Sequence, residues 1–323
     1  MIRDSGFQAV FPLAIIAAAT FLACSPEGNE SSAPQETGTV AAAAPVSAQP
    51  PTMQELANAT FSGLQDEPVQ LVDGGWQGEP FVEGGASVPA VGLVRDFHLV
   101  GDVTGDGNEE SVVLLWTSSG GSGTFDYLAV VGRSAAGVAN LGTAMLGDRV
   151  QLRQGRLSEG TIEIDVVQAG AEDAACCPTQ MATRVWEMGP DGLTEISSEI
   201  TGTLSAADLQ GPEWVLTDMA WDEPAPAEPE VTLVFEEDRV AGNAGCNGYF
   251  GGFEEDTEMP TNLSFGAMGA TRKMCAEEIM RVEDRFFKQL NGVTHFGFLA
   301  GKLALSWQDD TSAGVMMFAP REP

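Results

Sequence analysis

The stretch from Gly242 to Gly252, GNAGCNGYFGG, decides how the C-terminal part of this chain folds. It places one cysteine among several glycines, and glycine suits tight turns and bulges in which other residues are strained. No lysine follows in the spacing of a phosphate-binding loop, and the glycine spacing is not that of a dinucleotide-binding turn. The stretch therefore predicts a turn-rich β segment and not a phosphate site.

Downstream of this stretch the sequence TRKMC, residues 271–275, leads into the one clear helix. Four apolar residues recur at gaps of three, four and four positions, which is one face of an α-helix: Ile279, Val282, Phe286 and Leu290. Gly292 follows as a predicted C-cap. The spacing predicts an amphipathic helix packed on a core.

Strands are expected on both sides of the helix. Alternating apolar residues predict strands around Leu233 and Leu305, and the run 315–318 predicts a final one. The Pro- and Glu-rich segment Asp222 to Glu230, DEPAPAEPE, is expected to be an exposed loop between two strands. These elements define a predicted C-terminal domain, residues 204–323.

Taken together, these features resemble the META domain, the family that includes the heat-shock protein HslJ. The features that match are Trp214, the GCN tripeptide 245–247, the Thr-Met-Cys element 271–275, the helix and two closing strands, in that order. The resemblance implies a small β-barrel-like sheet with one packed helix. It also implies a disulfide between Cys246 and Cys275, which would close a loop worth roughly 3.6 kcal/mol in the chain-entropy model. Family members are envelope or secreted proteins linked to stress and drug tolerance, without an established catalytic reaction.

The preceding region, residues 53–203, has the pattern of a β-rich domain. The apolar runs 112–116 and 127–131 flank a Gly- and Ser-rich loop, 117–124, which predicts a hairpin. Apolar residues at 162, 164 and 166 alternate with polar ones, as in a strand with one buried face. The fold class predicted for the whole chain is mainly β, or α+β.

The same region resembles an uncharacterised domain of bacterial envelope lipoproteins. The resemblance extends from Asn58 to Pro178 and rests on the succession NATF, LVDGGW, GDVTGDGNEE, GGSGTF, LGDRV and ACCP. It implies no assigned chemistry.

One segment of this region has the spacing of a calcium loop. Oxygen-bearing side chains stand at positions one, three, five, seven and nine, with glycine at position six, as in EF-hand-like and FG-GAP-type loops: Asp102, Thr104, Asp106, Asn108 and Glu110. Position three usually carries Asp or Asn, and position twelve is Val113 instead of a bidentate Glu. We expect either a weak Ca²⁺ site or an Asx-rich turn without a metal.

The N-terminus predicts export and a lipid anchor. Residues 11–23, FPLAIIAAATFLA, have the length of a signal-peptide core. The tetrad Phe21 to Cys24 resembles a bacterial lipobox, which implies cleavage after residue 23 and lipidation of Cys24 with acyl chains such as palmitate. An uncleaved anchor and simple secretion are the alternatives. All three place the mature chain in the cell envelope, and Ser25 would imply the periplasmic face of the outer membrane in a Gram-negative cell.

The composition of residues 24–52, rich in Ala, Pro and Ser, predicts a disordered tether between this anchor and the folded region. The 323-residue chain has 15 Lys plus Arg against 47 Asp plus Glu, a formal net charge of -32. This charge would repel nucleic acids and anionic headgroups, so the lipid remains the means of membrane attachment. The acidity serves either solubility or cation binding.

Four cysteines remain besides Cys24, and in an oxidising compartment they predict two disulfides with three possible connectivities. If Cys246 and Cys275 pair as the resemblance implies, Cys176 and Cys177 have only each other within the chain. A vicinal disulfide, free thiols and an intermolecular bond are the three outcomes for them. A metal site on these cysteines would need further ligands.

The sequence offers little for catalysis, since only His98 and His295 are present and they lie in different regions. We therefore expect a protein without enzymatic activity. Three functional classes follow: an envelope lipoprotein that supports envelope integrity or stress tolerance by binding or interaction, a carrier of a lipid or small hydrophobic ligand, and a calcium-dependent adhesion or assembly module. The partner is an envelope protein or hydrophobic ligand that the sequence does not identify.

Overall fold

The computed structural model describes residues 49–321 except 122, 135, 175 and 222. All of them belong to one compact unit, residues 44–323. The predicted signal peptide, Cys24 and most of the predicted tether lie outside the described residues. The described chain is mainly β, with two α-helices and one short 3-10 helix in the described ranges, which confirms the predicted fold class.

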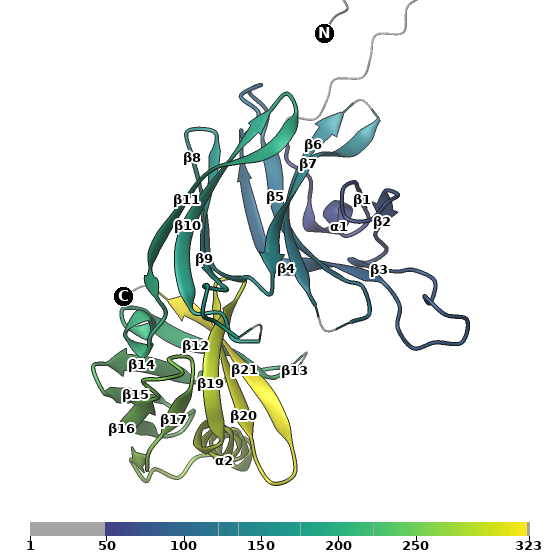
Figure 1. The fold of residues 1–323 in the computed structure, drawn as a ribbon. Helices are drawn as coiled ribbons and strands as arrows, with labels where there is room; N and C mark the ends of the chain where they lie inside the picture. The colour runs from purple at the N-terminus through teal and green to yellow at the C-terminus, as the bar shows by residue number, and fades with distance from the viewer. Residues whose placement is uncertain (1–48, 122, 135, 175, 222, 322–323) are drawn as a thin grey trace, which may run out of the picture. The chain divides into compact units, whose positions relative to one another are not determined.

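The first sheet has five antiparallel strands in the order β3-β4-β5-β6-β7 (Figure 1). Its strands are β3 (Gly75–Gln77), β4 (Ala90–Gly101), β5 (Glu110–Ser118), β6 (Phe125–Ser134) and β7 (Gly137–Asp148). The predicted hairpin is confirmed, because β5 pairs with β6 from Ser111 opposite Val131 to Thr117 opposite Phe125.

Strands β5 and β6 are buried on both faces, which explains why their sequences are solid apolar runs. One face packs on a small cap made of α1 (Met53–Leu56), β1 (Thr60–Phe61) and β2 (Val69–Gln70). Val113 and Leu115 point to this cap, whereas Val112 and Leu114 point to the opposite face. A central strand covered on both sides has no solvent face on which to alternate.

The opposite face packs on a second antiparallel sheet, ordered β11-β10-β9-β8. Its strands are β8 (Gln151–Ser158), β9 (Thr161–Gln168), β10 (Gln180–Gly189) and β11 (Gly192–Thr203). The predicted alternation in β9 is confirmed, since Ile162, Ile164 and Val166 are buried in the core between the sheets. Along β11, residues 194–201 are exposed on both faces, because no sheet covers this edge strand there.

A buried arginine joins the free edges of the two sheets. Arg184 of β10 is only 8 % exposed and donates from Nη1 to the carbonyl of Leu146 in β7, at 2.6 Å. Its Nε and Nη2 reach both carboxylate oxygens of Glu195, at 2.8 and 2.7 Å, and its guanidinium lies over the Trp186 ring. These partners satisfy the buried charge of Arg184. Because β7 and β11 belong to different sheets and do not pair, the hydrogen bonds of Arg184 link the two strands instead.

The C-terminal region begins with a 3-10 helix, η1 (Ala206–Leu209), and forms one long antiparallel sheet. Its path is β17-β16-β15-β14-β12-β21-β20-β19, and a bridge between Asn262 and His295 joins the two ends, so the barrel is nearly closed. The strands are β12 (Glu213–Ala220), β13 (Glu223–Pro224), β14 (Thr232–Glu236), β15 (Arg239–Asn243), β16 (Gly248–Glu255), β17 (Leu263–Phe265), β18 (Gly269–Ala270), β19 (Val293–Leu299), β20 (Lys302–Gln308) and β21 (Ala313–Arg321). The predicted loop between β12 and β14 is mostly exposed over residues 223–230 and includes β13.

The one long helix, α2 (Glu277–Asn291), lies against this sheet at the position where the sequence predicts it (Figure 1). Phe286 and Leu290 are fully buried, and Gly292 forms the C-cap. The buried face also contains two polar residues, Glu283 and Gln289, which apolar periodicity does not reveal.

Glu283 is buried because its carboxylate accepts hydrogen bonds from the GCN turn, residues 245–247. Its carboxylate accepts from the Asn247 main-chain N–H at 2.7 Å and from Asn247 Nδ2 at 2.8 Å. The Asn247 side-chain oxygen in turn accepts from Thr271 Oγ1 at 2.8 Å and from the Lys273 N–H at 2.7 Å. One asparagine thus joins the turn, the 271–275 loop and α2, and the adjacent disulfide links Cys246 to Cys275.

The substitution Glu283→Ala should destabilise this region by about 3 kcal/mol, because it leaves two buried Asn247 donors without an acceptor. The control is Glu278→Ala on the exposed side of the same helix, which should change stability by less than about 0.5 kcal/mol. Urea denaturation with the disulfide intact measures both. Equal effects of the two substitutions would contradict the assigned role of Glu283.

Candidate functional site

The predicted calcium loop connects β4 and β5. Asp102 folds the loop on itself, because its Oδ1 accepts from the Gly105 N–H at 2.7 Å and its Oδ2 from the Gly107 N–H at 3.0 Å. Both glycines have positive φ, 74° and 85°, which explains glycine at these two positions. Asp106 Oδ1 accepts from the main chain of Asn108 at 2.8 Å. This is the Asx-rich turn that the sequence allows.

Glu110 lies beneath this turn and is 3 % exposed. Its Oε2 accepts from the N–H groups of Val103 and Thr104, at 3.0 and 3.1 Å. Burial raises the pKa of this carboxyl, and the nearby charges of Asp106 and Asp102 act in the same direction. As arranged here, no group of three or more His, Cys, Asp or Glu side chains in the described ranges could hold a metal ion. The calcium site stays a prediction.

Both predicted cysteine pairs are bonded in the structure. Cys246 joins Cys275, and the adjacent Cys176 and Cys177 form a vicinal disulfide. The vicinal pair lies in the loop between β9 and β10, which Asp173 closes by accepting from the Gly170 and Thr179 N–H groups at 2.8 and 2.7 Å.

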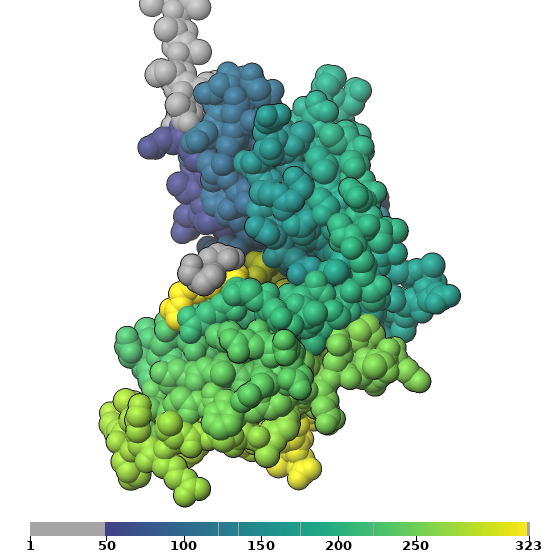
Figure 2. Space-filling model, turned by 90° about the vertical axis from the view of Figure 1, so that its left-hand side faces the viewer, coloured from purple at the N-terminus to yellow at the C-terminus, as the bar shows by residue number. Residues whose placement is uncertain are grey.

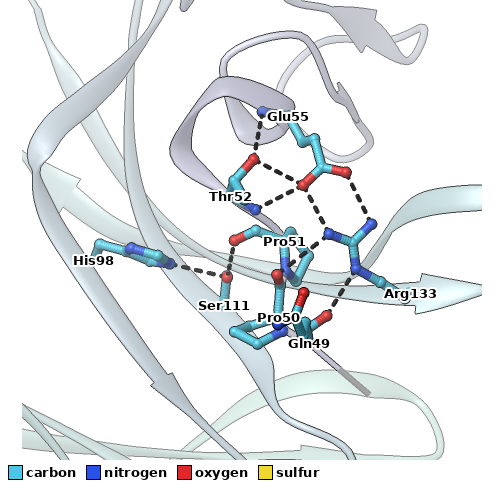
Figure 3. A network of polar contacts seen from close by, with 8 residues as sticks. All are labelled: Gln49, Pro50, Pro51, Thr52, Glu55, His98, Ser111 and Arg133. Carbon is cyan, nitrogen blue, oxygen red and sulfur yellow. Dashed lines mark hydrogen bonds and ion pairs between the residues drawn. The ribbon is translucent and has the colours of Figure 1, made fainter. Parts of the chain in front are cut away.

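A polar clip holds the first described residues on the first sheet (Figure 3). Arg133 of β6 donates to the Gln49 carbonyl at 2.7 Å and to the Pro50 carbonyl at 3.3 Å. The same guanidinium pairs with both carboxylate oxygens of Glu55, at 2.7 and 2.8 Å. Glu55 also completes a capping box with Thr52 at the start of α1. Residues 49–52, predicted as the end of the tether, are therefore bound by the folded region.

The clip includes a serine–histidine pair that is not built for catalysis. Ser111 Oγ donates to the Pro51 carbonyl at 2.9 Å, and His98 Nε2 lies 2.9 Å from the same oxygen. Since the serine proton goes to Pro51, His98 acts as the donor and has no proton to accept from Ser111. Ser111 is also fully buried. The second histidine, His295, is exposed and contacts Thr294 Oγ1.

A cleft of about 590 Å³ lies where the turn between β19 and β20 meets β8. Two main-chain donors of this turn region reach β8: the Phe298 N–H donates to Gln151 Oε1 at 2.8 Å, and the Gly301 N–H to the Leu152 carbonyl at 3.0 Å. Lys302 Nζ lies 2.9 Å from Asp96 of β4. In Figure 2 the green-to-yellow residues of the C-terminal region abut the blue-to-teal residues of the preceding sheets.

The cleft combines apolar walls with a few charged groups. Phe97, Trp214 and Phe298 lie behind its wall, each buried at 4 to 6 % exposure, and Arg153, Asp208 and Lys302 are among its charged residues. Its volume and mixed lining are those of small-molecule sites. Sequence reasoning missed this cleft, because its walls come from segments far apart in the chain and no local motif marks them.

Comparison with known proteins identifies the C-terminal region. Residues 207–321 match the profile of the META domain, so this region is a META domain, as its motifs predict. No curated protein matches the chain. A solved structure, described as the "NMR structure of the protein from Burkholderia xenovorans", is 22 % identical, with 36 % of this chain and 85 % of that chain covered and a TM-score of 0.28.

The class defined by these findings is a mainly β protein with a C-terminal META domain. META is not a known enzyme family. The likeness of residues 58–178 to an envelope-lipoprotein domain stays a prediction, as do the domain bounds 53–203 and 204–323. Within the described ranges, none of the helices has both the length and the apolar character required to cross a bilayer.

The clip predicts a pH-dependent contribution to stability. Hydrogen bonds from Arg133, followed by those from Thr52, lower the pKa of Glu55 from 4.5 to about 2. A lowered folded-state pKa stabilises the fold above the unfolded pKa, and this contribution is lost as the pH falls from about 4.5 to 2. Glu55→Gln should therefore cost about 1 kcal/mol at pH 6, a value reduced for solvent screening, and progressively less towards pH 3. Urea midpoints across this range measure it, with the exposed Glu67→Gln as control, and a cost independent of pH would contradict the role of the Glu55 charge.

Calcium binding is tested by melting the protein in excess CaCl₂ and in chelator. If the loop binds calcium, ten times the dissociation constant should add about 1.4 kcal/mol, and Asp102→Ala with Asp106→Ala should abolish the difference. Equal melting temperatures in both buffers would remove the site and leave the Asx-rich turn alone.

Proposed function

We propose that this protein is a lipid-anchored envelope protein that acts by binding and not by catalysis, with the cleft between the META domain and β8 as its binding site. The observation that carries the proposal is the cleft itself, about 590 Å³ in volume, with a mixed lining of apolar residues and a few charged groups. Support of envelope integrity or stress tolerance is the role expected of such a protein from its META resemblance.

The anchoring part of the proposal rests on the lipobox-like tetrad ending at Cys24 and on the clip at Arg133. Tension or motion from a tether would reach the fold at Gln49. There the guanidinium of Arg133, on the inner strand β6, bonds to Gln49 and to Glu55. A fixed attachment point on a buried strand suits a domain displayed on the predicted tether.

The non-enzymatic part rests on the described polar groups. The Ser111–His98 pair is oriented as a donor chain towards Pro51, and Ser111 is buried. The META match also points away from known enzyme families. The net charge of -32 makes a nucleic-acid partner unfavourable.

If the protein carries a hydrophobic ligand, this geometry favours the cleft as the binding site over the interior of the META sheet. That interior is filled by buried aromatic side chains, including Phe235, Phe286, Phe296 and Phe318, each 2 % exposed or less. A ligand there would have to displace a packed core, whereas the cleft is already open.

Fractionation and native mass spectrometry test the two parts separately. Wild-type protein and Ser25→Ala should remain in the membrane fraction with an acylated N-terminal peptide, and Cys24→Ser should lose both properties. Protein extracted from its own envelope should carry a bound small molecule. Thr201→Trp, at an exposed position on the cleft wall, should lose this molecule, whereas Ser197→Trp on the same strand should retain it. A membrane-free wild type would overturn the anchor, and the same amount of bound small molecule on the two tryptophan variants would overturn the binding site.

A further inference from the structure

Among the described residues that line the cleft, Arg153 is the one arginine, and much of its hydrogen-bonding capacity is unused. Its Nη1 contacts the thioether sulfur of Met181, a weak acceptor. The oxygen of its ion-pair partner, Asp208 Oδ1, is 3.6 Å away, beyond ordinary hydrogen-bond length. The side chain is 27 % exposed, so its remaining N–H groups are neither fully solvated nor well paired.

Other arginines of the same sheet show the contrast. Arg156, three positions along β8, contacts both Glu163 and Asp165. Arg184 has two short hydrogen bonds to Glu195 and a third to a main-chain carbonyl. Arg153 is thus the member of this group that faces the cleft with open donors.

The surroundings hold this guanidinium in place. Its Cζ lies 5.0 Å from the centroid of the Phe298 ring, a cation–π contact that fixes the plane of the side chain. Phe298 is itself positioned by its main-chain bond to Gln151 and packs near Trp214, with ring centroids 6.2 Å apart. The guanidinium of Arg153 is therefore held against a buried aromatic ring, which leaves its remaining donors on the side of the cleft.

The acidic residues of the cleft are already engaged elsewhere. Asp208 Oδ2 accepts from the Ser205 N–H at 2.9 Å and so caps η1. Asp96 pairs with Lys302, and Asp165 accepts from Arg156 and Thr183. Only the loosely placed Oδ1 of Asp208 competes for Arg153.

We propose that Arg153 binds the oxyanion head group of an amphipathic ligand whose apolar chain lies along Met181 and the other partly exposed apolar residues of the cleft wall. Two guanidinium N–H groups match two oxygens of a carboxylate or a phosphate monoester, and the partly exposed apolar lining accepts the chain. The inference rests on the proposed function of this cleft as a binding site, and it names the ligand class.

Calorimetric titration of the full chain carrying Cys24→Ser tests the proposal, since this change removes the anchor's own acyl chains. The probes are decanoate, decyl phosphate, decanol and decyltrimethylammonium below their micellar concentrations. Decanoate or decyl phosphate should bind about ten-fold or more tightly than decanol, because only the anions form charged hydrogen bonds. The tighter of the two anions distinguishes a fatty-acid ligand from a lipid with a phosphate monoester. Decanol binding as tight as both anions would overturn the proposal.

Three variants locate the head group. Arg153→Met keeps the apolar stem over Phe298 and should abolish the preference for anions. Arg156→Met on the same strand should leave it unchanged. Asp208→Asn keeps an oxygen to cap Ser205 but removes the competing charge, so it should tighten anion binding roughly five-fold.

Anion affinity that is equal in wild type and Arg153→Met would overturn the assignment, provided that circular dichroism shows both to be folded. Tightening by Asp208→Asn is the readout that a purely structural role of Arg153 does not produce. Failure of every probe would also overturn the ligand class, while the tryptophan variants at positions 201 and 197 still test the cleft as a binding site independently.

Discussion

The contact between the β19–β20 turn and β8 is the interaction on which the cleft depends. Two main-chain N–H groups, of Phe298 and Gly301, are satisfied by Gln151 and by the Leu152 carbonyl. Gly301 has φ of +85° and approaches the Arg153 carbonyl, so a larger residue there would strain the turn. Because β8 is an edge strand of its sheet, its free polar groups are available for this contact.

This contact also sets the electrostatics of the cleft. It places the Phe298 ring under Arg153, and it brings Lys302 to Asp96. Lys302 is therefore paired with a carboxylate, whereas Arg153 lies mainly on an aromatic ring. What distinguishes Arg153 from the other arginines is its place in the lining of the cleft. The planar fork of a guanidinium matches two oxygens of an oxyanion.

Polar groups with several partners elsewhere serve the fold. Asn247 and Glu283 satisfy one another between the GCN turn and α2, Arg184 joins two sheet edges, and the partly exposed Arg133 fixes the start of the described chain. For the buried Asn247, Glu283 and Arg184, the loss of one partner would leave the others unsatisfied. Arg153 differs from them in this respect, and the binding hypothesis depends on that difference.

Local sequence determined much of the fold. The double-sided apolar runs of β5 and β6, the alternation in β9 and the three-four-four spacing of α2 each follow from residues that are neighbours in the chain. The META motifs predicted the C-terminal domain and its disulfide through resemblance, and the spacing from Asp102 to Glu110 predicted a turn that the structure contains. Only the tertiary structure decided that Glu283 and Gln289 are buried, that Arg133 holds Gln49, and that Arg153, Asp208 and Phe298 share one cleft. The physical reason is that periodicity reports which face of an element is apolar, whereas the partners of a polar side chain come from whichever distant strand or turn packs beside it.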